Sequence, residues 1–221
     1  MGVSLQGVGM TSLRTRERMI KRLEDQGIQN QKLLEIMRDT PRHIFMDEAL
    51  SSRAYEDTAL PIGYNQTISQ PYIVAKMTEL LLESSSHLRN VLEIGTGCGY
   101  QTAVLAQLVD HVYSIERLLP LQRKAKEHLS ELKIYNVSYL YNDGQLGWPD
   151  HAPFDAILVT AAPEEIPAQL LQQLAVGGVM VIPVGLSGGP QTLQRVWRKG
   201  SSYQVEMLEE VTFVPFLSGK D

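Results

Sequence analysis

The sequence predicts a doubly wound α/β domain with an N-terminal helical extension and C-terminal antiparallel strands. From Asn90 onward, short apolar or β-branched runs alternate with helix-like stretches, which is the pattern of a parallel sheet covered on both faces. After Gly189 the helix-like stretches stop while strand-like runs continue, which indicates an antiparallel edge. The 221 residues are enough to bury a large core without disulfides or a structural metal.

The extension, residues 1–85, is expected to be helical and irregular and to form one compact unit with the sheet domain. Residues 1–12 are aperiodic and should be loose, and residues 41–70 should be irregular. Pro71 is well placed in the first turn of a helix. Apolar residues at helical spacing predict three helices, from Leu13 to about Gly27, from about Leu33 to before Pro41, and from Pro71 to about Glu83.

The sheet domain, residues 86–221, contains eight strand-like runs. Five predict the main strands, at Val91–Ile94, His111–Ile115, Val137–Tyr141, Phe154–Thr160 and Gly178–Val184. Three stretches between them predict helices, at Gln101–Leu108, Leu119–Leu132 and Ile166–Leu174. The last three runs predict the antiparallel strands, at Thr192–Trp197, Tyr203–Leu208 and Val211–Pro215.

The charge balance argues against nucleic-acid and membrane partners. Twenty Lys and Arg against 25 Asp and Glu give a formal net charge of −5, whereas binders of nucleic acid or anionic membranes usually carry a basic excess. Cys98 is the only cysteine, so no internal disulfide forms and a reducing compartment is expected. The N-terminus lacks the apolar segment of a signal peptide, and no apolar run approaches a membrane span. We therefore expect a cytoplasmic protein.

The strongest local signal is a glycine-rich turn between a buried strand and a helix. It reads Glu93-Ile94-Gly95-Thr96-Gly97-Cys98-Gly99-Tyr100. Such a turn lets the backbone approach a ligand at the carboxyl end of a strand, where open α/β sheets bind their ligands. A dinucleotide fingerprint requires a third glycine where this chain has Tyr100. The pattern E-x-G-x-G-x-G therefore disfavours a nicotinamide oxidoreductase, which is the rival at the level of the fold.

Two acidic residues end the next strands on the same rim. Glu116 can accept hydrogen bonds from both hydroxyls of a ribose, with a solvated charge at a strand end as the alternative. Asp143, followed by the flexible Gly144, can accept a hydrogen bond from an adenine amino group, although an Asp-Gly pair also forms simple turns. Because three consecutive strands end in suitable groups, we favour the binding interpretation for both.

A loop outside the sheet, Pro61–Pro71, contains Ser69. Its Gly, Asn, Thr and Ser residues between flanking prolines are typical of loops, and loops on a rigid scaffold often carry function. Ser69 stands just before Pro71 at the start of a helix, so the residues alone indicate an N-cap.

Six segments together match one family. They are Arg42-His43-Ile44-Phe45, Gln66-Thr67-Ile68-Ser69-Gln70-Pro71, Leu92-Glu93-Ile94-Gly95-Thr96-Gly97, Gly147-Trp148-Pro149, Ala152-Pro153-Phe154-Asp155-Ala156-Ile157 and Gly177-Gly178-Val179-Met180-Val181-Ile182-Pro183-Val184-Gly185. From about Arg42 to Phe216 the chain resembles protein-L-isoaspartate O-methyltransferases. The glycine turn alone marks only a broad class of S-adenosylmethionine enzymes, whereas the T-I-S-x-P loop is much more specific.

The resemblance implies a Rossmann-like S-adenosylmethionine-dependent methyltransferase sheet and a monomer. It implies methyl transfer from S-adenosyl-L-methionine to the free carboxylate of L-isoaspartyl residues in damaged proteins and peptides, which starts repair through a succinimide. Ser69 is implied as the catalytic serine. The cofactor-binding residues that it implies are Gln66, Thr67, Ile68, Glu93, Gly95, Thr96, Gly97, Cys98, Glu116, Asp143 and Gly144.

Three residues depart from the family pattern. Asn65 stands where many members have a second glycine, Cys98 replaces a commoner serine, and Asn142 precedes Asp143 where glycine is usual. None of them removes a chemical group that the reaction needs, so they bear on rate and loop shape.

The implied chemistry needs no strong base, because a carboxylate with a reference pKa of about 4 is ionised at neutral pH. The enzyme must instead align the carboxylate oxygen with the methyl–sulfur bond and remove water. We therefore expect Ser69 to orient the carboxylate through its hydroxyl without becoming a covalent nucleophile. Backbone groups of the same loop and of Val214-Pro215 are expected to hold the peptide.

The residues disfavour several other classes of protein. Gly185–Gly189 matches the G-x-S-x-G motif of hydrolases, but that motif requires a helix immediately after it, and Pro190 follows here. An RNA methyltransferase would want a basic channel and often an Asn/Asp-Pro-Pro-aromatic motif, where this chain has Thr160-Ala161-Ala162-Pro163. The five histidines lack metal-ligand spacing, so no metal is expected. A small-molecule acceptor and a catalytically silent cofactor-binding protein stay open.

Overall fold

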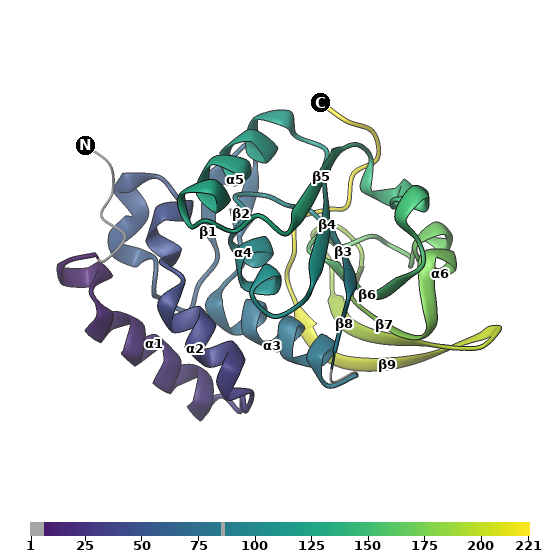
Figure 1. Ribbon diagram of the computed structural model, residues 1–221, viewed down its shortest axis with the longest axis horizontal. Helices are drawn as coiled ribbons and strands as arrows, with labels where there is room; N and C mark the ends of the chain where they lie inside the picture. The colour runs from purple at the N-terminus through teal and green to yellow at the C-terminus, as the bar shows by residue number, and fades with distance from the viewer. Residues whose placement is uncertain (1–6, 85–86) are drawn as a thin grey trace.

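The computed structural model describes residues 7–84 and 87–221. Seven strands form its central sheet: β3 (Asn90–Ile94), β4 (His111–Glu116), β5 (Val137–Tyr141), β6 (Phe154–Val159), β7 (Leu174–Gly185), β8 (Gln191–Lys199) and β9 (Ser202–Val211). Their order across the sheet is β5-β4-β3-β6-β7-β8-β9 (Figure 1). β3 to β7 run parallel, and β8 and β9 are antiparallel. The predicted doubly wound sheet with an antiparallel edge is confirmed.

The strand order places a topological switch beside β3. From β3 the chain proceeds outward through β4 to β5 and then returns to β6 on the other side of β3. Open α/β sheets bind their ligands outside the carboxyl ends of the strands at such a point. The glycine-rich turn follows β3 directly, so the topology places it where a ligand is expected.

Helices cover both faces of the sheet. α3 (Pro71–Leu82), α4 (Tyr100–Ala106) and α5 (Leu119–Glu131) lie on one face, and α6 (Ala168–Gln173) lies on the other (Figure 1). The residues of β3 alternate between the two cores, as the pleat of a strand requires. Val91 packs with residues of α3 and α4, while Leu92 and Ile94 pack with Leu170 of α6.

The N-terminal helices α1 (Leu13–Asp25) and α2 (Gln31–Asp39) lie within a few residues of their predicted positions. Their apolar faces share one core cluster with α4, in which Leu23 and Leu33 join Tyr100 and Val104. Residues 1–6, half of the segment that was expected to be loose, lie outside the described residues, and Gly9–Thr11 form a short 3-10 helix.

The segment 41–70 has more regular structure than the sequence predicts. It contains two 3-10 helices, η2 (Arg42–Phe45) and η3 (Glu48–Arg53), and a hairpin of β1 (Leu60–Gly63) and β2 (Gln66–Ile68). The two turn residues of the hairpin, Tyr64 and Asn65, have φ values of 54° and 55°. A two-residue turn of this kind requires positive φ at both positions, and asparagine tolerates it well. Asn65 therefore suits this turn without a second glycine.

The predicted strand at Val211–Pro215 is wrong. β9 ends at Val211, and Pro215 forms only an isolated bridge with Ala162. Proline cannot donate a backbone hydrogen bond to a ladder, and the chain instead crosses the carboxyl edge of the sheet. There Ala162 N donates to Val214 O and Phe216 N donates to Ala162 O, both at 2.9 Å.

The G-x-S-x-G segment lies in the turn between β7 and β8, which pair as an antiparallel hairpin. The chain makes no strand-to-helix elbow there, so the geometry that a hydrolase motif needs is missing.

Within residues 7–84 and 87–221 no helix combines the length and the apolar character needed to cross a membrane. In the same ranges no three His, Cys, Asp or Glu side chains are grouped to hold a metal ion.

Candidate active site

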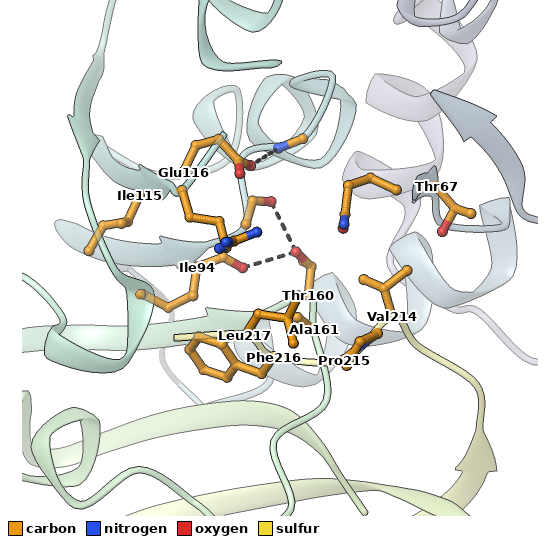
Figure 2. Close-up of a pocket in the computed structure, with 15 residues that line it drawn as sticks. Thr67, Ile94, Ile115, Glu116, Thr160, Ala161, Val214, Pro215, Phe216 and Leu217 are labelled. Atoms are coloured by element: carbon orange, nitrogen blue, oxygen red, sulfur yellow. Dashed lines mark hydrogen bonds between the residues drawn. The ribbon is translucent and has the colours of Figure 1, made fainter. Parts of the chain in front are cut away.

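A pocket opens at the carboxyl edge of the sheet, where β3, β4 and β6 end (Figure 2). It contains about 620 Å³ of space, part of it open to solvent. The lining residues come from the strand ends, the β2 loop and the tail after β9. They are Gln66, Thr67, Ile94, Gly95, Gly97, Ile115, Glu116, Arg117, Gly144, Thr160, Ala161, Val214, Pro215, Phe216 and Leu217.

A second pocket adjoins the first on the side of the β2 loop. The two pockets share Thr67, Gly95, Gly97 and Thr160. The remaining walls of the second pocket come from the β2 loop, α3, the glycine turn and α4. They are Ile68, Ser69, Val74, Thr96, Cys98, Tyr100 and Gln101. The loop of Ser69 and the glycine turn are distant in the sequence, but the fold brings them to one place.

The glycine turn is shaped by close backbone packing at Gly95. Its φ is +94°, and an added Cβ would overlap the hydroxyl oxygen of Thr160. A residue with a side chain would therefore be strained and would displace Thr160. The next glycine of the motif, Gly97, donates its amide to Oε2 of Glu116 at 2.8 Å.

Glu116 is buried at the end of β4 and fixed by the backbone on both carboxylate oxygens. Oε2 accepts from Gly97 N, and Oε1 accepts from Leu118 N at 2.9 Å. Burial raises the pKa of this carboxyl, while the amide hydrogen bonds oppose the rise. Each oxygen keeps a further lone pair, so the side chain can still accept hydroxyl groups from a ligand in the first pocket.

Glu93 lies beneath the turn and lines neither pocket. It is fully buried, and its Oε2 accepts hydrogen bonds of 2.5 Å from the hydroxyls of Thr102 and Ser114. Ser114 Oγ lies 2.6 Å from the hydroxyl of Thr96 in the turn. Burial raises the pKa of Glu93 to about 7, against the effect of the two hydroxyls. Glu93 therefore supports the turn through the hydroxyls of Ser114 and Thr96.

Of the neighbours Asp143 and Gly144, the structure places only Gly144 in a pocket. Gly144 lines the first pocket, where an added Cβ would lie 3.0 Å from the ring of Phe216. Asp143 lines neither pocket: its Oδ1 accepts from Gln145 N at 2.9 Å and its Oδ2 accepts from Gly219 N at 2.7 Å. The carboxylate thus holds the C-terminal segment beside the pocket.

Ser69 is half-buried and is not the N-cap of α3, so the cap interpretation is wrong. The cap position is Gln70, which makes no side-chain cap bond. Within the described part of the chain the hydroxyl of Ser69 makes no hydrogen bond, and Ser69 lines the second pocket. Its donor and acceptor capacity is available to a ligand there.

Several lining residues were not singled out from the sequence. Ile94 is the last residue of β3 and Ile115 the last but one of β4, positions beside the turn that could have identified them. Phe216 and Leu217 reach the pocket only because the chain after β9 folds back across the sheet edge, and no local pattern signals that path. Thr160 ends a predicted strand, and no local pattern signals its contact with the glycine turn.

One family model, described as Protein-L-isoaspartate(D-aspartate) O-methyltransferase, matches residues 14–221. This chain belongs to that family. The resemblance drawn from the T-I-S-x-P loop and the glycine turn is thereby confirmed.

Relatives and solved structures agree with the family assignment. The protein-L-isoaspartate O-methyltransferase of Cellvibrio japonicus is 60% identical over 218 residues, which cover 97% of this chain and 96% of the relative. That of Saccharophagus degradans is 57% identical and covers 98% of this chain and 97% of the relative. A solved protein-L-isoaspartate O-methyltransferase is 28% identical with a TM-score of 0.82, covering 90% of this chain and 65% of the solved one.

A second solved structure supports the fold alone. It is a protein-L-isoaspartate O-methyltransferase from Plasmodium falciparum in complex with S-adenosyl-L-homocysteine. It is 24% identical, with a TM-score of 0.76 over 91% of this chain and 98% of that one.

Proposed function

We propose that this protein transfers the methyl group of S-adenosyl-L-methionine to the free carboxylate of L-isoaspartyl residues in damaged proteins and peptides. The amide nitrogen of the following residue then attacks the ester carbonyl and methanol leaves, which gives a succinimide whose hydrolysis starts the return to ordinary aspartate. One observation carries the proposal: the Gln66–Ser69 loop and the Gly95–Gly97 turn line two adjoining pockets. A donor in one pocket and an acceptor in the other would meet at their junction.

The first pocket fits the methyl donor. At Gly95 and Gly144 the space that a Cβ would fill is taken by Thr160, Ile94 and Phe216, so the backbone itself forms a close cradle. Glu116 offers carboxylate lone pairs to ribose hydroxyls, and Gly144 lines the part of the pocket proposed to take the base. The residues proposed to hold the cofactor, directly or by supporting the glycine turn or the C-terminal segment beside the pocket, are Gln66, Thr67, Ile68, Glu93, Gly95, Thr96, Gly97, Cys98, Glu116, Asp143 and Gly144.

The second pocket is proposed to take the acceptor, with Ser69 as its catalytic residue. When bound, S-adenosyl-L-methionine supplies an electrophilic methyl group. The hydroxyl of Ser69 donates to one oxygen of the acceptor carboxylate and leaves the other directed at the junction. Val74 and Tyr100 also line this pocket, and the loss of water when the acceptor binds would strengthen this hydrogen bond.

Cys98 lines the same pocket as a group that does not compete for the methyl group. Burial raises the pKa of its thiol to about 11. Because the thiolate is the nucleophilic form, Cys98 is neutral and unreactive at pH 7. The replacement of the usual serine by Cys98 is therefore compatible with the reaction.

We further propose that residues 1–85 and 86–221 act as one compact unit, that the protein is monomeric and cytoplasmic, and that it binds neither nucleic acid nor membranes. The boundary residues 85 and 86 lie outside the described residues. The core cluster common to α1, α2 and α4 supports the single unit, and the net charge of −5 supports the absence of polyanionic partners.

The proposal is tested by methyl transfer from labelled S-adenosyl-L-methionine to a pair of peptides that differ only in containing L-isoaspartate or ordinary aspartate. We expect base-labile label on the isoaspartyl peptide alone. Label on neither peptide, with cofactor binding intact, would overturn the acceptor assignment and leave the donor site standing.

A further inference from the structure

We propose that Thr160 is a positioning residue for methyl transfer, and this inference rests on the function proposed above. Its hydroxyl ties the glycine turn after β3 to the end of β6 at the junction of the two pockets. It thereby sets the direction in which the donor faces the acceptor.

The hydrogen bonds of Thr160 join two strand ends. Its Oγ1 donates to the carbonyl oxygens of Ile94 and Gly95, each at 2.9 Å, and its amide donates to Ile94 O at 3.0 Å. Figure 2 shows both hydroxyl bonds at the centre of the site. Because Gly95 tolerates no Cβ beside Thr160, this hydroxyl fills the space that the glycine leaves.

Thr160 lies where the reacting groups would meet. It is one of four residues that line both pockets, with Thr67, Gly95 and Gly97. A hydroxyl has a single proton, and that of Thr160 is engaged by the backbone carbonyls. This oxygen therefore has no proton left to donate to a ligand at the junction.

Lone pairs at this point complement the hydroxyl of Ser69. Ser69 has an uncommitted proton and can donate to a carboxylate, whereas the acceptor-only oxygen of Thr160 repels a carboxylate and attracts a cationic sulfonium group. The two side chains would thus give the junction opposite polarity at its two sides. This arrangement favours one orientation of the acceptor and opposes the reverse one.

The turn does not depend on Thr160 alone. Gly95 N donates to Ile115 O at 2.8 Å, and Gly97 N donates to Glu116. Loss of the Thr160 hydroxyl should therefore leave the cofactor cradle in place but allow the Gly95 carbonyl to reorient. Since a misplacement of about 1 Å can cost about 100-fold in rate, the loss should lower kcat much more than affinity.

Two matched variants test the proposal. Thr160→Val keeps the shape and removes the hydroxyl, and Thr160→Ser keeps the hydroxyl and removes the methyl group. With an isoaspartyl peptide we expect Thr160→Val to lower kcat about tenfold or more. The Kd for S-adenosyl-L-homocysteine should stay within about threefold, and Thr160→Ser should keep kcat within about threefold of the wild type.

Other results would overturn the proposal in distinguishable ways. Wild-type kcat in Thr160→Val shows that the hydroxyl is dispensable, and a rise in Kd equal to the fall in kcat shows a merely structural role. If Thr160→Val fails to fold, Thr160→Ser and Thr160→Ala replace it. A kcat of Thr160→Ser more than tenfold below that of the wild type would contradict the proposal. A kcat of Thr160→Ser within threefold of the wild type, together with a folded but slow Thr160→Ala, would support it. Wild-type enzyme that leaves the isoaspartyl peptide unlabelled contradicts the proposed function, and this inference with it.

Discussion

The amide of Gly97 donates a 2.8 Å hydrogen bond to Oε2 of Glu116, which joins the glycine turn after β3 to the end of β4. The other carboxylate oxygen of Glu116 is held by the amide of Leu118 at 2.9 Å. Both oxygens are thereby fixed before any ligand arrives. This preorganisation suits recognition of two neighbouring hydroxyl groups, because no ordering cost is left to binding.

Glu116→Gln should weaken cofactor binding. An amide offers one oxygen where the carboxylate offers two, so its NH₂ group would face either Gly97 N or Leu118 N. We expect the Kd for S-adenosyl-L-homocysteine to rise about tenfold or more, since hydrogen bonds to charged groups contribute about 1.5–3 kcal/mol. Isothermal titration calorimetry measures this, with Glu131→Gln at the exposed end of α5 as the control. Unchanged affinity would remove Glu116 from the site.

Ser69→Ala should separate catalysis from cofactor binding. The hydroxyl is proposed to orient the acceptor carboxylate and makes no hydrogen bond to the described protein, so its loss should not disturb the fold. We expect kcat with an isoaspartyl peptide to fall about tenfold or more, in line with the loss of one positioning hydrogen bond. The Kd for S-adenosyl-L-homocysteine should not change. The exposed Ser52→Ala serves as the control, and full turnover in Ser69→Ala contradicts the role assigned to Ser69.

Glu93 should make the protein less stable as the pH rises. Its pKa is raised to about 7 in the folded state from an ordinary value of 4.5, so folding favours the protonated form. The contribution is fully present below pH 4.5 and is lost as the pH rises through about 7, and it amounts to at most about 3 kcal/mol. Urea unfolding from pH 5 to pH 8 measures this change.

The matched variant for this pH dependence is Glu93→Gln. It keeps an oxygen for the hydroxyls of Thr102 and Ser114 but does not titrate. We expect a flatter stability profile above pH 5, with the remaining decline due in part to Glu116, whose pKa is also raised by burial. An identical slope in Glu93→Gln and the wild type would show that Glu93 is not the titrating group.

Asp221→Asn should loosen the segment that covers the first pocket. Arg117 donates from Nη2 to Asp221 Oδ2 at 2.6 Å and from Nε to Gly219 O at 3.1 Å. Asp221 is largely exposed, so the loss of stability should stay below about 1 kcal/mol. We expect faster release of S-adenosyl-L-homocysteine at low salt, with the difference shrinking at high salt. Equal stopped-flow release rates at low salt would show that the contact does not restrain the pocket.

The sequence predicted those features that rest on local patterns. Apolar runs identified the five parallel strands, and the glycine turn with Glu116 placed the cofactor site at the carboxyl edge, because each signal lies within one strand and the turn after it. The hairpin at Leu60–Ile68 was missed because its strands are short and its turn is Tyr-Asn rather than an Asn-Gly pair.

The remaining features depend on contacts between distant segments. Asp143 is predicted to contact an adenine, and in the structure its Oδ2 accepts the amide of Gly219, 76 positions away. Thr160 bonds the turn at Gly95, 65 positions away. Neither partner can be inferred from the residues around Asp143 or Thr160, because the pairing exists only once β6 and the C-terminal segment have folded onto the turn.

The most direct test of the account is a crystal structure of the protein with S-adenosyl-L-homocysteine and an L-isoaspartyl peptide. We predict the ribose hydroxyls within hydrogen-bond distance of Glu116 and the free carboxylate bonded to the hydroxyl of Ser69. One carboxylate oxygen should face the sulfur across the junction beside Thr160. A peptide whose carboxylate is bound away from Ser69, or a cofactor outside the pocket between Gly95 and Gly144, would contradict the account.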